Sequence, residues 1–382
     1  MIPKSVAPKL IISASVSDAD MFYATKFFVP DPFIYLEKKG KKHVVMSELE
    51  IDRARKSMRD FTIWSWNNLA EKISKKGSPH RPGIAEIAIK LCKINRVSKV
   101  VVPGNFPLEH ARELEKSGIV VTPVRGSIFP ERDLKSPSEI KAIREALRIT
   151  QAGISSGKEA LRRSKVAKNG QLKLDGTPLT AERLRAIIDA KILEFGGIAQ
   201  DTIVACGNQG CDPHERGHGP LKAKLPIIVD VFPRISKTGY HGDITRTFVK
   251  GRPKDIVFKI YDAVHAAQTN SIAAISHDVA TTVPHQVVCE TFENLGFKTG
   301  KHPKTGVNQG FFHGTGHGLG LEIHEMPRMG KNSSGLLLAT QVVTVEPGLY
   351  YPGIGGVRLE DVVVVTKRKP RNLVDIEKDL LV

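Results

Sequence analysis

The sequence contains no long hydrophobic run. None of its apolar stretches approaches the roughly 18 residues that a membrane-spanning helix needs. Residues 1–18 carry two lysines and a short apolar segment, but that segment is too brief and too interrupted for a secretory signal. We therefore expect a protein without membrane spans, located in the cytoplasm.

Cysteine is also scarce, with four residues in a chain of 382. They are Cys92, Cys206, Cys211 and Cys289, and they form no C-x-x-C pair. This spacing excludes a disulfide scaffold and a thiolate-bound structural zinc site. We expect reduced thiols, as in a cytoplasmic protein.

Basic residues are abundant, and the formal net charge is +17. Such an excess can indicate a nucleic-acid partner. The basic residues are dispersed, however, over the runs 38–42, 72–76, 162–173, 222–224 and 367–371, and none of these runs is interleaved with aromatics for base stacking. We therefore expect a generally basic surface and no nucleic-acid partner.

The length allows two domains, which we place at 1–132 and 133–382. The first part alternates apolar runs with helical patterns and is predicted to be an α/β unit. Its expected strands are 9–13, 43–47, 99–102 and 119–124, and its expected helices are 50–59 and 109–116. It shows no catalytic cluster of His with Asp or Glu, and Trp64 and Trp66 are interpreted as packing residues.

The second part begins with helix signals. Ser136 followed by Pro137 predicts a long helix to about Arg162, and Thr180 is the expected N-cap of a helix over 180–194. The intervening stretch 163–179 is basic and polar, which favours a loop.

Two acidic hairpins follow. In the first, a strand over 225–232 carries Asp230, and Asp243 opens a strand over 244–250; in the second, a strand over 342–345 ends at Glu346, and a return strand over 357–366 carries Glu360. The acidic residues are 13 apart in one hairpin and 14 in the other, and two helices, 253–275 and 281–295, lie between the hairpins. We infer an internal two-fold repeat, because unrelated surface hairpins do not explain carboxylates flanked by Ile and Val.

A histidine-rich segment, 311–327, lies between the hairpins and contains His313, His317 and His324. Four glycines alternate with these histidines, which disfavours a helix and predicts an extended or looped segment that a ligand can approach.

Four converging carboxylates would repel one another, and two divalent cations would neutralise them. Oxygen-rich ligation with one imidazole suits Mn²⁺, Fe²⁺, Co²⁺ or Zn²⁺. Paired metals lower the pKa of a bridging water and polarise a carbonyl, so the pattern predicts hydrolysis, most naturally of an amide.

Five stretches resemble the M24 metallopeptidases of pita-bread fold. They read KSPSEIKAIREALRITQ from Lys135, TRTF after Asp243, HGTGHGLGLEIHEMP, VEPGLYY and VRLED. The N-terminal part is similar to that of creatinase and aminopeptidase P. The resemblance covers nearly the whole chain and implies a two-domain α/β protein, with a creatinase-like domain over 1–132 and a pita-bread domain of duplicated α+β halves over 133–382.

The resemblance also implies a ligand set for two metals, with Mn²⁺ expected first and Co²⁺, Fe²⁺ or Zn²⁺ as alternatives. The five ligands are Asp230, Asp243, His317, Glu346 and Glu360. Asp243 and Glu360 would bridge both ions, and Glu346 would take the proton from the nucleophilic water. His324 would bind substrate and steady the tetrahedral intermediate.

Further residues match substrate-contacting positions. His214 matches better than its neighbour His218, His313 sits where relatives often have a second active-site histidine, and Arg358 is expected at the site as an organiser of the ligand shell. The chain departs from the family after Asp230, where a small residue usually stands two positions later and the connection is shorter. This departure could alter substrate preference.

The full ligand set with a full N-terminal domain points to an Xaa-Pro aminopeptidase acting through a metal-bridging hydroxide. The alternative is a prolidase restricted to dipeptides, because Arg328 lies where some prolidases hold the dipeptide carboxylate. An alternative of another class is a non-catalytic RNA- or ribosome-binding protein on the same fold. Proline-containing peptides are the expected substrates, and the resemblance suggests a homodimer.

Overall fold

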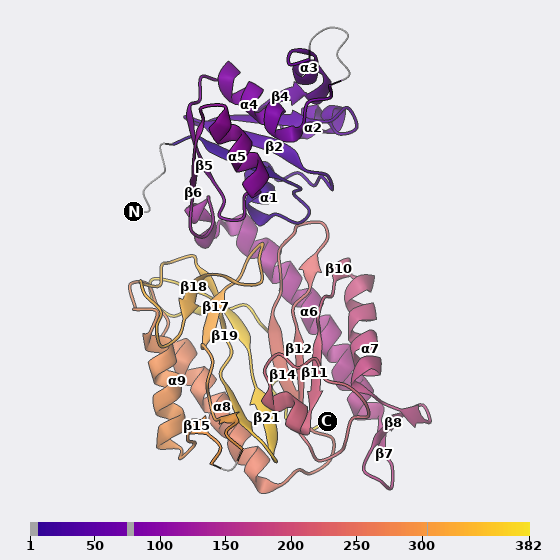
Figure 1. Ribbon diagram of the computed structural model, residues 1–382. Coiled ribbons are helices and arrows are strands. Elements are labelled where there is room, and N and C mark those ends of the chain that lie inside the picture. Colours follow the sequence, from indigo (N-terminus) through magenta and orange to yellow (C-terminus); the bar gives the residue numbers. More distant parts are fainter. Residues whose placement is uncertain (1–6, 75–79, 304) are drawn as a thin grey trace. The chain divides into compact units, whose positions relative to one another are not determined.

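The computed structural model describes residues 7–74, 80–303 and 305–382. The chain divides into two compact units, residues 1–132 and 133–382, which are described separately (Figure 1). Among the described residues, the helices are too short or too polar to cross a membrane. All four cysteines are free thiols in this structure.

The first unit is built on a six-stranded sheet of order β4-β3-β2-β1-β5-β6. Its strands are β1 Lys9–Ser13, β2 Phe33–Lys38, β3 Lys41–Met46, β4 Phe61–Ser65, β5 Lys99–Val102 and β6 Val120–Pro123. Its helices are α1 Ala19–Thr25, α2 Ile51–Ser57, α3 Trp66–Glu71, α4 Ile84–Ile94 and α5 Leu108–Lys116. Trp64 and Trp66 pack against one of its apolar cores, as expected for packing residues.

Two helix pairs frame the strands of the second unit (Figure 1). They are α6 Pro137–Arg163 with α7 Ala181–Glu194, and α8 Asp255–Ala273 with α9 Val283–Asn294. Ser136 and Glu139 form a capping box at the start of α6, where the sequence predicted a helix to begin, and Thr180 caps α7 as predicted. Gly153 and Gly157 let α6 approach α7, because a Cβ at either position would come within 3 Å of Ile192 or Ile188.

The stretch 163–179 is not a loop, and this prediction was wrong. It forms a small three-stranded sheet of β7 Lys165–Val166, β8 Leu172–Leu174 and β9 Thr177–Pro178. Leu172 and Leu174 are buried while Lys173 between them is exposed. The alternation is only three residues long, so the surrounding lysines obscured it in the sequence.

The two acidic hairpins are present as antiparallel strand pairs. In the first half, β12 Ile227–Val231 lies between β11 Ile203–Cys206 and β14 Ile244–Phe248. In the second half, the sheet order is β18-β17-β19-β22-β23, with β17 Gly316–Gly318, β18 Glu325–Met329, β19 Val342–Val345, β22 Asp361–Val364 and β23 Arg371–Asn372. Short pairs complete this unit: β10 Gly197–Ile198 with β13 Arg234–Ile235, and β15 Gly300–Lys301 with β16 Asn308–Gln309.

The second hairpin differs from the prediction in its connection. A two-stranded ribbon, β20 Gly348–Tyr351 with β21 Gly355–Arg358, is inserted between β19 and β22. Glu360 therefore lies between two strands and not within one return strand over 357–366. The apolar residues on both sides of Glu360 concealed this break in the sequence.

Candidate active site

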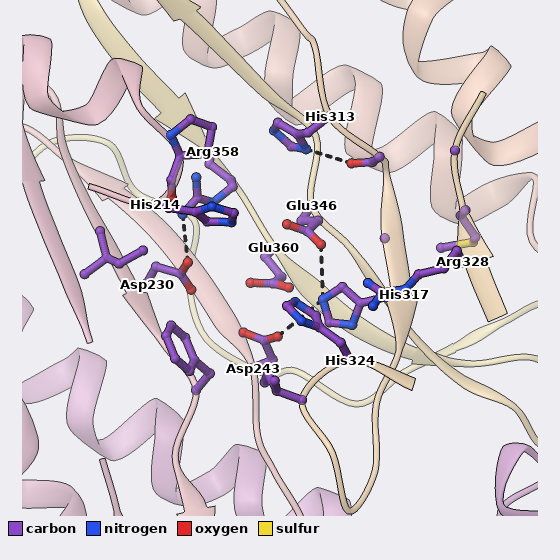
Figure 2. Close-up of a pocket in the computed structure, with 18 of the residues that line it drawn as sticks. His214, Asp230, Asp243, His313, His317, His324, Arg328, Glu346, Arg358 and Glu360 are labelled. Atoms are coloured by element: carbon purple, nitrogen blue, oxygen red, sulfur yellow. Dashed lines mark hydrogen bonds and ion pairs between the residues drawn. The ribbon is translucent and has the colours of Figure 1, made fainter. Parts of the chain in front are cut away.

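The four acidic residues of the hairpins face one cavity of about 660 Å³ in the second unit. Asp230 lies in β12 and Asp243 immediately before β14, while Glu346 directly follows β19 and Glu360 directly precedes β22. Both hairpins thus deliver one carboxylate at or after the first strand and one before the return strand. Figure 2 shows all four turned toward the same space, with His317 beside them.

Asp243, His317 and Glu360 form the tightest part of this cluster. Their potential ligand atoms all lie within 4.8 Å of one another, and all three residues are buried. His317 Nε2 is 3.3 Å from Glu346 Oε1 and 3.7 Å from Asp243 Oδ2. His317 Nδ1 is 3.0 Å from the carbonyl of Gly318 and donates to it, which leaves Nε2 directed at the carboxylates.

The electrostatics of the cluster are unfavourable for the protein alone. Burial and the nearby Asp230 raise the pKa of Asp243 well above its usual value, and burial and Asp243 do the same to the pKa of Glu360. Burial also opposes ionisation of Glu346, but its hydrogen bond and charge interaction with His317 lower its pKa to about 2. Ionisation of all these carboxylates together would therefore leave more negative charge than the cations of the site balance.

The residues fit divalent metal ions. Asp230 Oδ1 is buried and has no hydrogen-bond partner in the structure, which is costly for a carboxylate oxygen. A metal ion in the cluster would satisfy this oxygen and remove the repulsion between Asp243 and Glu360. Carboxylate oxygens with one imidazole are a donor set for Mn²⁺, Fe²⁺, Co²⁺ or Zn²⁺.

Arg358 is held by protein groups around the ligand shell. Its Nη2 is 2.7 Å from Asp230 Oδ2 and its Nη1 is 3.1 Å from the hydroxyl of Tyr350, and the side chain is almost fully buried. These contacts leave little of the guanidinium for a ligand. The geometry supports the organising role that the sequence suggested more than direct substrate contact.

The histidines singled out in the sequence line the same cavity. His313 Nε2 is 2.8 Å from the Tyr350 hydroxyl, and burial lowers the pKa of His313. Burial together with the charges of His317 and Arg328 lowers the pKa of His324 to about 4, so this imidazole is neutral at pH 7. His214 and Arg328 also line the cavity, whereas His218 is not among its lining residues.

The loop that carries His324 rests on a buried ion pair that the sequence did not reveal. Lys135 Nζ is 2.7 Å from Glu325 Oε2, and both side chains are nearly inaccessible. Glu325 Oε1 accepts hydrogen bonds from the backbone N–H groups of Leu321 and Glu322. The Glu in HEMP was visible, but Lys135 lies 190 residues away, so only the fold could pair them.

Tyr350 is a second site component that sequence reasoning missed. It is buried, it connects His313 to Arg358 through its hydroxyl, and burial raises its pKa to about 12. Its place in the stretch VEPGLYY, four residues after Glu346, was the only available signal.

Comparison with known proteins places the chain in a family. The model of metallopeptidase family M24 matches residues 141–367, more than half of the chain. A putative Xaa-Pro aminopeptidase of Mycoplasma genitalium is 34% identical over 62% of this chain, and the match spans only 61% of that relative. An uncharacterized peptidase of Staphylococcus saprophyticus is 30% identical over 94% of this chain and 93% of its own length.

A solved structure extends the likeness to both units. The Xaa-Pro dipeptidase from Bacillus anthracis superposes with a TM-score of 0.82 at 22% identity, covering 99% of this chain and 96% of that one. At this identity the likeness shows the fold, and it confirms the predicted two-domain architecture. Together with the family match, it confirms the resemblance found in the sequence: the chain belongs to metallopeptidase family M24.

Proposed function

We propose that this protein is a metal-dependent exopeptidase that releases the first residue from peptides with proline in second place. The observation that carries the proposal is the buried cluster of Asp243, His317 and Glu360, with Asp230 and Glu346 facing the same cavity. The bond preference rests on relatives, because the Mycoplasma genitalium protein is named an Xaa-Pro aminopeptidase and the Bacillus anthracis structure an Xaa-Pro dipeptidase.

Two divalent ions, for which we propose Mn²⁺, would be held by the four hairpin carboxylates and His317. When bound, such ions polarise the scissile carbonyl and lower the pKa of the attacking water. The proposed ligands are Asp230, Asp243, His317, Glu346 and Glu360.

The remaining steps fall to side chains of the protein. Glu346 is ionised, because its pKa is lowered to about 2, and its carboxylate accepts the proton of the attacking water. His324 is neutral at pH 7 and can donate a hydrogen bond to the oxygen that becomes negative in the tetrahedral intermediate. His214 and His313 flank the same cavity and orient the peptide.

Two versions of this function differ in the length of the substrate: an aminopeptidase acts on longer peptides, and a dipeptidase acts on Xaa-Pro dipeptides alone. We favour an aminopeptidase, because the cavity is large enough for more than a dipeptide. Its volume of about 660 Å³ lies in the range of pockets that bind larger, drug-sized ligands. One observation favours the dipeptidase: Arg328 lines the cavity and, within the described ranges, has no ion-pair partner. Its guanidinium could bind the terminal carboxylate of an Xaa-Pro dipeptide. We also propose a homodimer, on the resemblance alone.

The test is the release of alanine from Ala-Pro-Ala and from Ala-Pro by metal-stripped enzyme that is reloaded with Mn²⁺, Co²⁺, Fe²⁺ or Zn²⁺. Asp243→Ala and His317→Ala should each abolish activity. Asp262→Ala and His265→Ala change the same residue types on the exposed face of α8 and should leave activity intact. Full activity of either cluster variant, or of chelated enzyme, would contradict the proposal.

A further inference from the structure

A second cavity adjoins the catalytic one within the same unit. It has a volume of about 400 Å³. It lies between α9, the segment 311–314 before β17 and the segment 330–332 after β18. Four residues line both cavities: Phe312, His313, Gly314 and Gly330. The two cavities therefore meet at these four residues, beside the cluster of carboxylates.

The second cavity is aromatic in character. Phe292 and Phe311 are buried and meet edge-to-face with ring centroids 5.6 Å apart, and Phe297 completes this apolar side. Charged groups are confined to Glu293 and Lys331. Uncharged polar side chains also line the cavity, namely His285, Thr299, His313 and Asn332. The aromatic side of the cavity is the part that suits a hydrophobic side chain.

Two polar side chains of the cavity, His285 and Cys289, already have partners. His285 Nδ1 is 3.0 Å from Thr315 Oγ1, and the Cys289 thiol is 3.6 Å from His285 Nε2. Burial lowers the pKa of His285, so the ring adds no charge at neutral pH. The interior consequently offers apolar contact more than ionic binding.

Phe312 stands at the junction of the two cavities. It is a large apolar side chain with 36% of its surface exposed, and its ring centroid is 5.3 Å from that of Tyr350. An aromatic in this position can contact a ligand that passes from one cavity to the other.

The direction of such a ligand follows from the proposed exopeptidase function, on which this inference rests. The residue before the scissile bond ends at its free amino group and cannot extend further. A longer peptide can therefore grow only on the leaving-group side, beyond the proline.

We propose that the cavity beside Phe312 is a subsite for a large apolar side chain, preferably aromatic, at the residue that follows proline. The enzyme would then act on peptides of three or more residues and favour Xaa-Pro-Phe over Xaa-Pro-Gly sequences. Contact with a hydrophobic pocket of this kind typically changes kcat/KM by at least tenfold.

The experiment compares Ala-Pro-Phe-Ala, Ala-Pro-Leu-Ala, Ala-Pro-Gly-Ala and Ala-Pro with the Mn²⁺-loaded full chain. The Phe peptide should exceed the Gly peptide about tenfold in kcat/KM. Two variants should bring the kcat/KM values of the Phe and Gly peptides close to equal. Cys289→Trp fills the cavity, and Phe297→Ala removes one of its walls. Glu290→Trp, at an exposed position of the same helix and outside the cavity lining, should retain the preference.

The possible outcomes distinguish failure of the proposed subsite from failure of the proposed exopeptidase function. Equal rates for the Phe and Gly peptides in the unchanged enzyme, or cleavage of Ala-Pro alone, would overturn the subsite and leave the Xaa-Pro peptidase intact. A preference that persists in both Cys289→Trp and Phe297→Ala would also overturn it. Failure to cleave any of the four peptides would instead contradict the proposed function. In a parallel series of peptides that differ only in the first residue (Phe, Leu or Gly), the relative kcat/KM values must stay the same in Phe297→Ala as in the unchanged enzyme.

Discussion

Arg358 is bound to one of the carboxylates of the candidate site. It binds Asp230 Oδ2 at 2.7 Å, and the other oxygen of Asp230 has no hydrogen-bond partner among the described residues. The guanidinium thus fixes one carboxylate oxygen and leaves the second free for a metal ion. Replacing a residue that orients a metal ligand in this manner usually lowers metal affinity or activity substantially.

Replacing Arg358 with methionine should weaken metal binding. We expect Arg358→Met to lower Mn²⁺ affinity about 10- to 100-fold, because Asp230 loses its anchor. Titration calorimetry on metal-stripped protein measures this directly, without an activity assay. Arg371→Met, on the exposed strand β23, is the matched control. Unchanged affinity in Arg358→Met would show that Asp230 is oriented by other groups.

His285 makes stability depend on pH. Burial holds its pKa in the folded state below 6.5, so the unfolded chain binds the proton more readily. The free energy of unfolding should therefore fall as the pH is lowered from 6.5 toward the depressed value. Urea unfolding at several pH values should show a smaller acid loss in His285→Gln than in the unchanged protein. His265→Gln, on an exposed position of α8, should keep the full loss.

Among the elements, β17 shows why the histidine segment is rich in glycine. A Cβ at Gly316 would lie 2.0 Å from the carbonyl oxygen of Thr344 on the adjacent strand β19. Only glycine allows the two strands to approach so closely, and His317 follows directly. The glycine therefore sets the position of the one imidazole in the cluster.

Gly316→Ala should displace β17 and with it His317. A shift of about 1 Å in a catalytic group costs roughly a hundredfold in rate, so we expect a comparable loss of kcat/KM. Gly300→Ala is the control, because a Cβ there meets no atom within 4 Å. Circular dichroism must show that both variants are folded. Near-normal activity of Gly316→Ala would mean that the strands adjust without moving the imidazole.

The ion pair of Lys135 and Glu325 anchors the loop of His324 to the segment before α6. Removing one partner of a buried pair leaves an uncompensated charge and costs about 3–5 kcal/mol. We expect Lys135→Met to destabilise the protein by about that amount in urea unfolding. Lys135→Met combined with Glu325→Gln should recover much of the loss, because the amide carbonyl still accepts from Leu321 and Glu322. Equal instability of the single and double variants would contradict this account.

Elements with strong local signals could be predicted from the sequence, and those set by tertiary contact could not. The capped helix α6 and the strands of both hairpins follow from capping residues and apolar runs. The sheet over 165–178 was missed because its three strands are two or three residues long. All five proposed ligands, inferred from the acidic pattern and the family resemblance, line one cavity. The pairing of Lys135 with Glu325, 190 residues apart, has no local signature.

On the scale of the whole molecule, we expect a bound metal ion to stabilise the second unit and not the first. The described residues of the first unit contain no group of three close metal-binding side chains, and the buried cluster lies in the second unit. Each unit has its own apolar core, which is the condition for independent unfolding. A ligand that binds only the folded second unit stabilises that unit alone.

Calorimetry of the metal-stripped full chain should therefore show two unfolding transitions, of which Mn²⁺ raises only one. At a free concentration 100 times the Kd, one bound ion stabilises the second unit by about 2.7 kcal/mol. Asp243→Asn should abolish the shift, because it removes a charged ligand from the centre of the cluster, while leaving the other transition unchanged. If Mn²⁺ moved both transitions equally, the units would unfold as one cooperative block and the boundary near residue 132 would have no thermodynamic meaning.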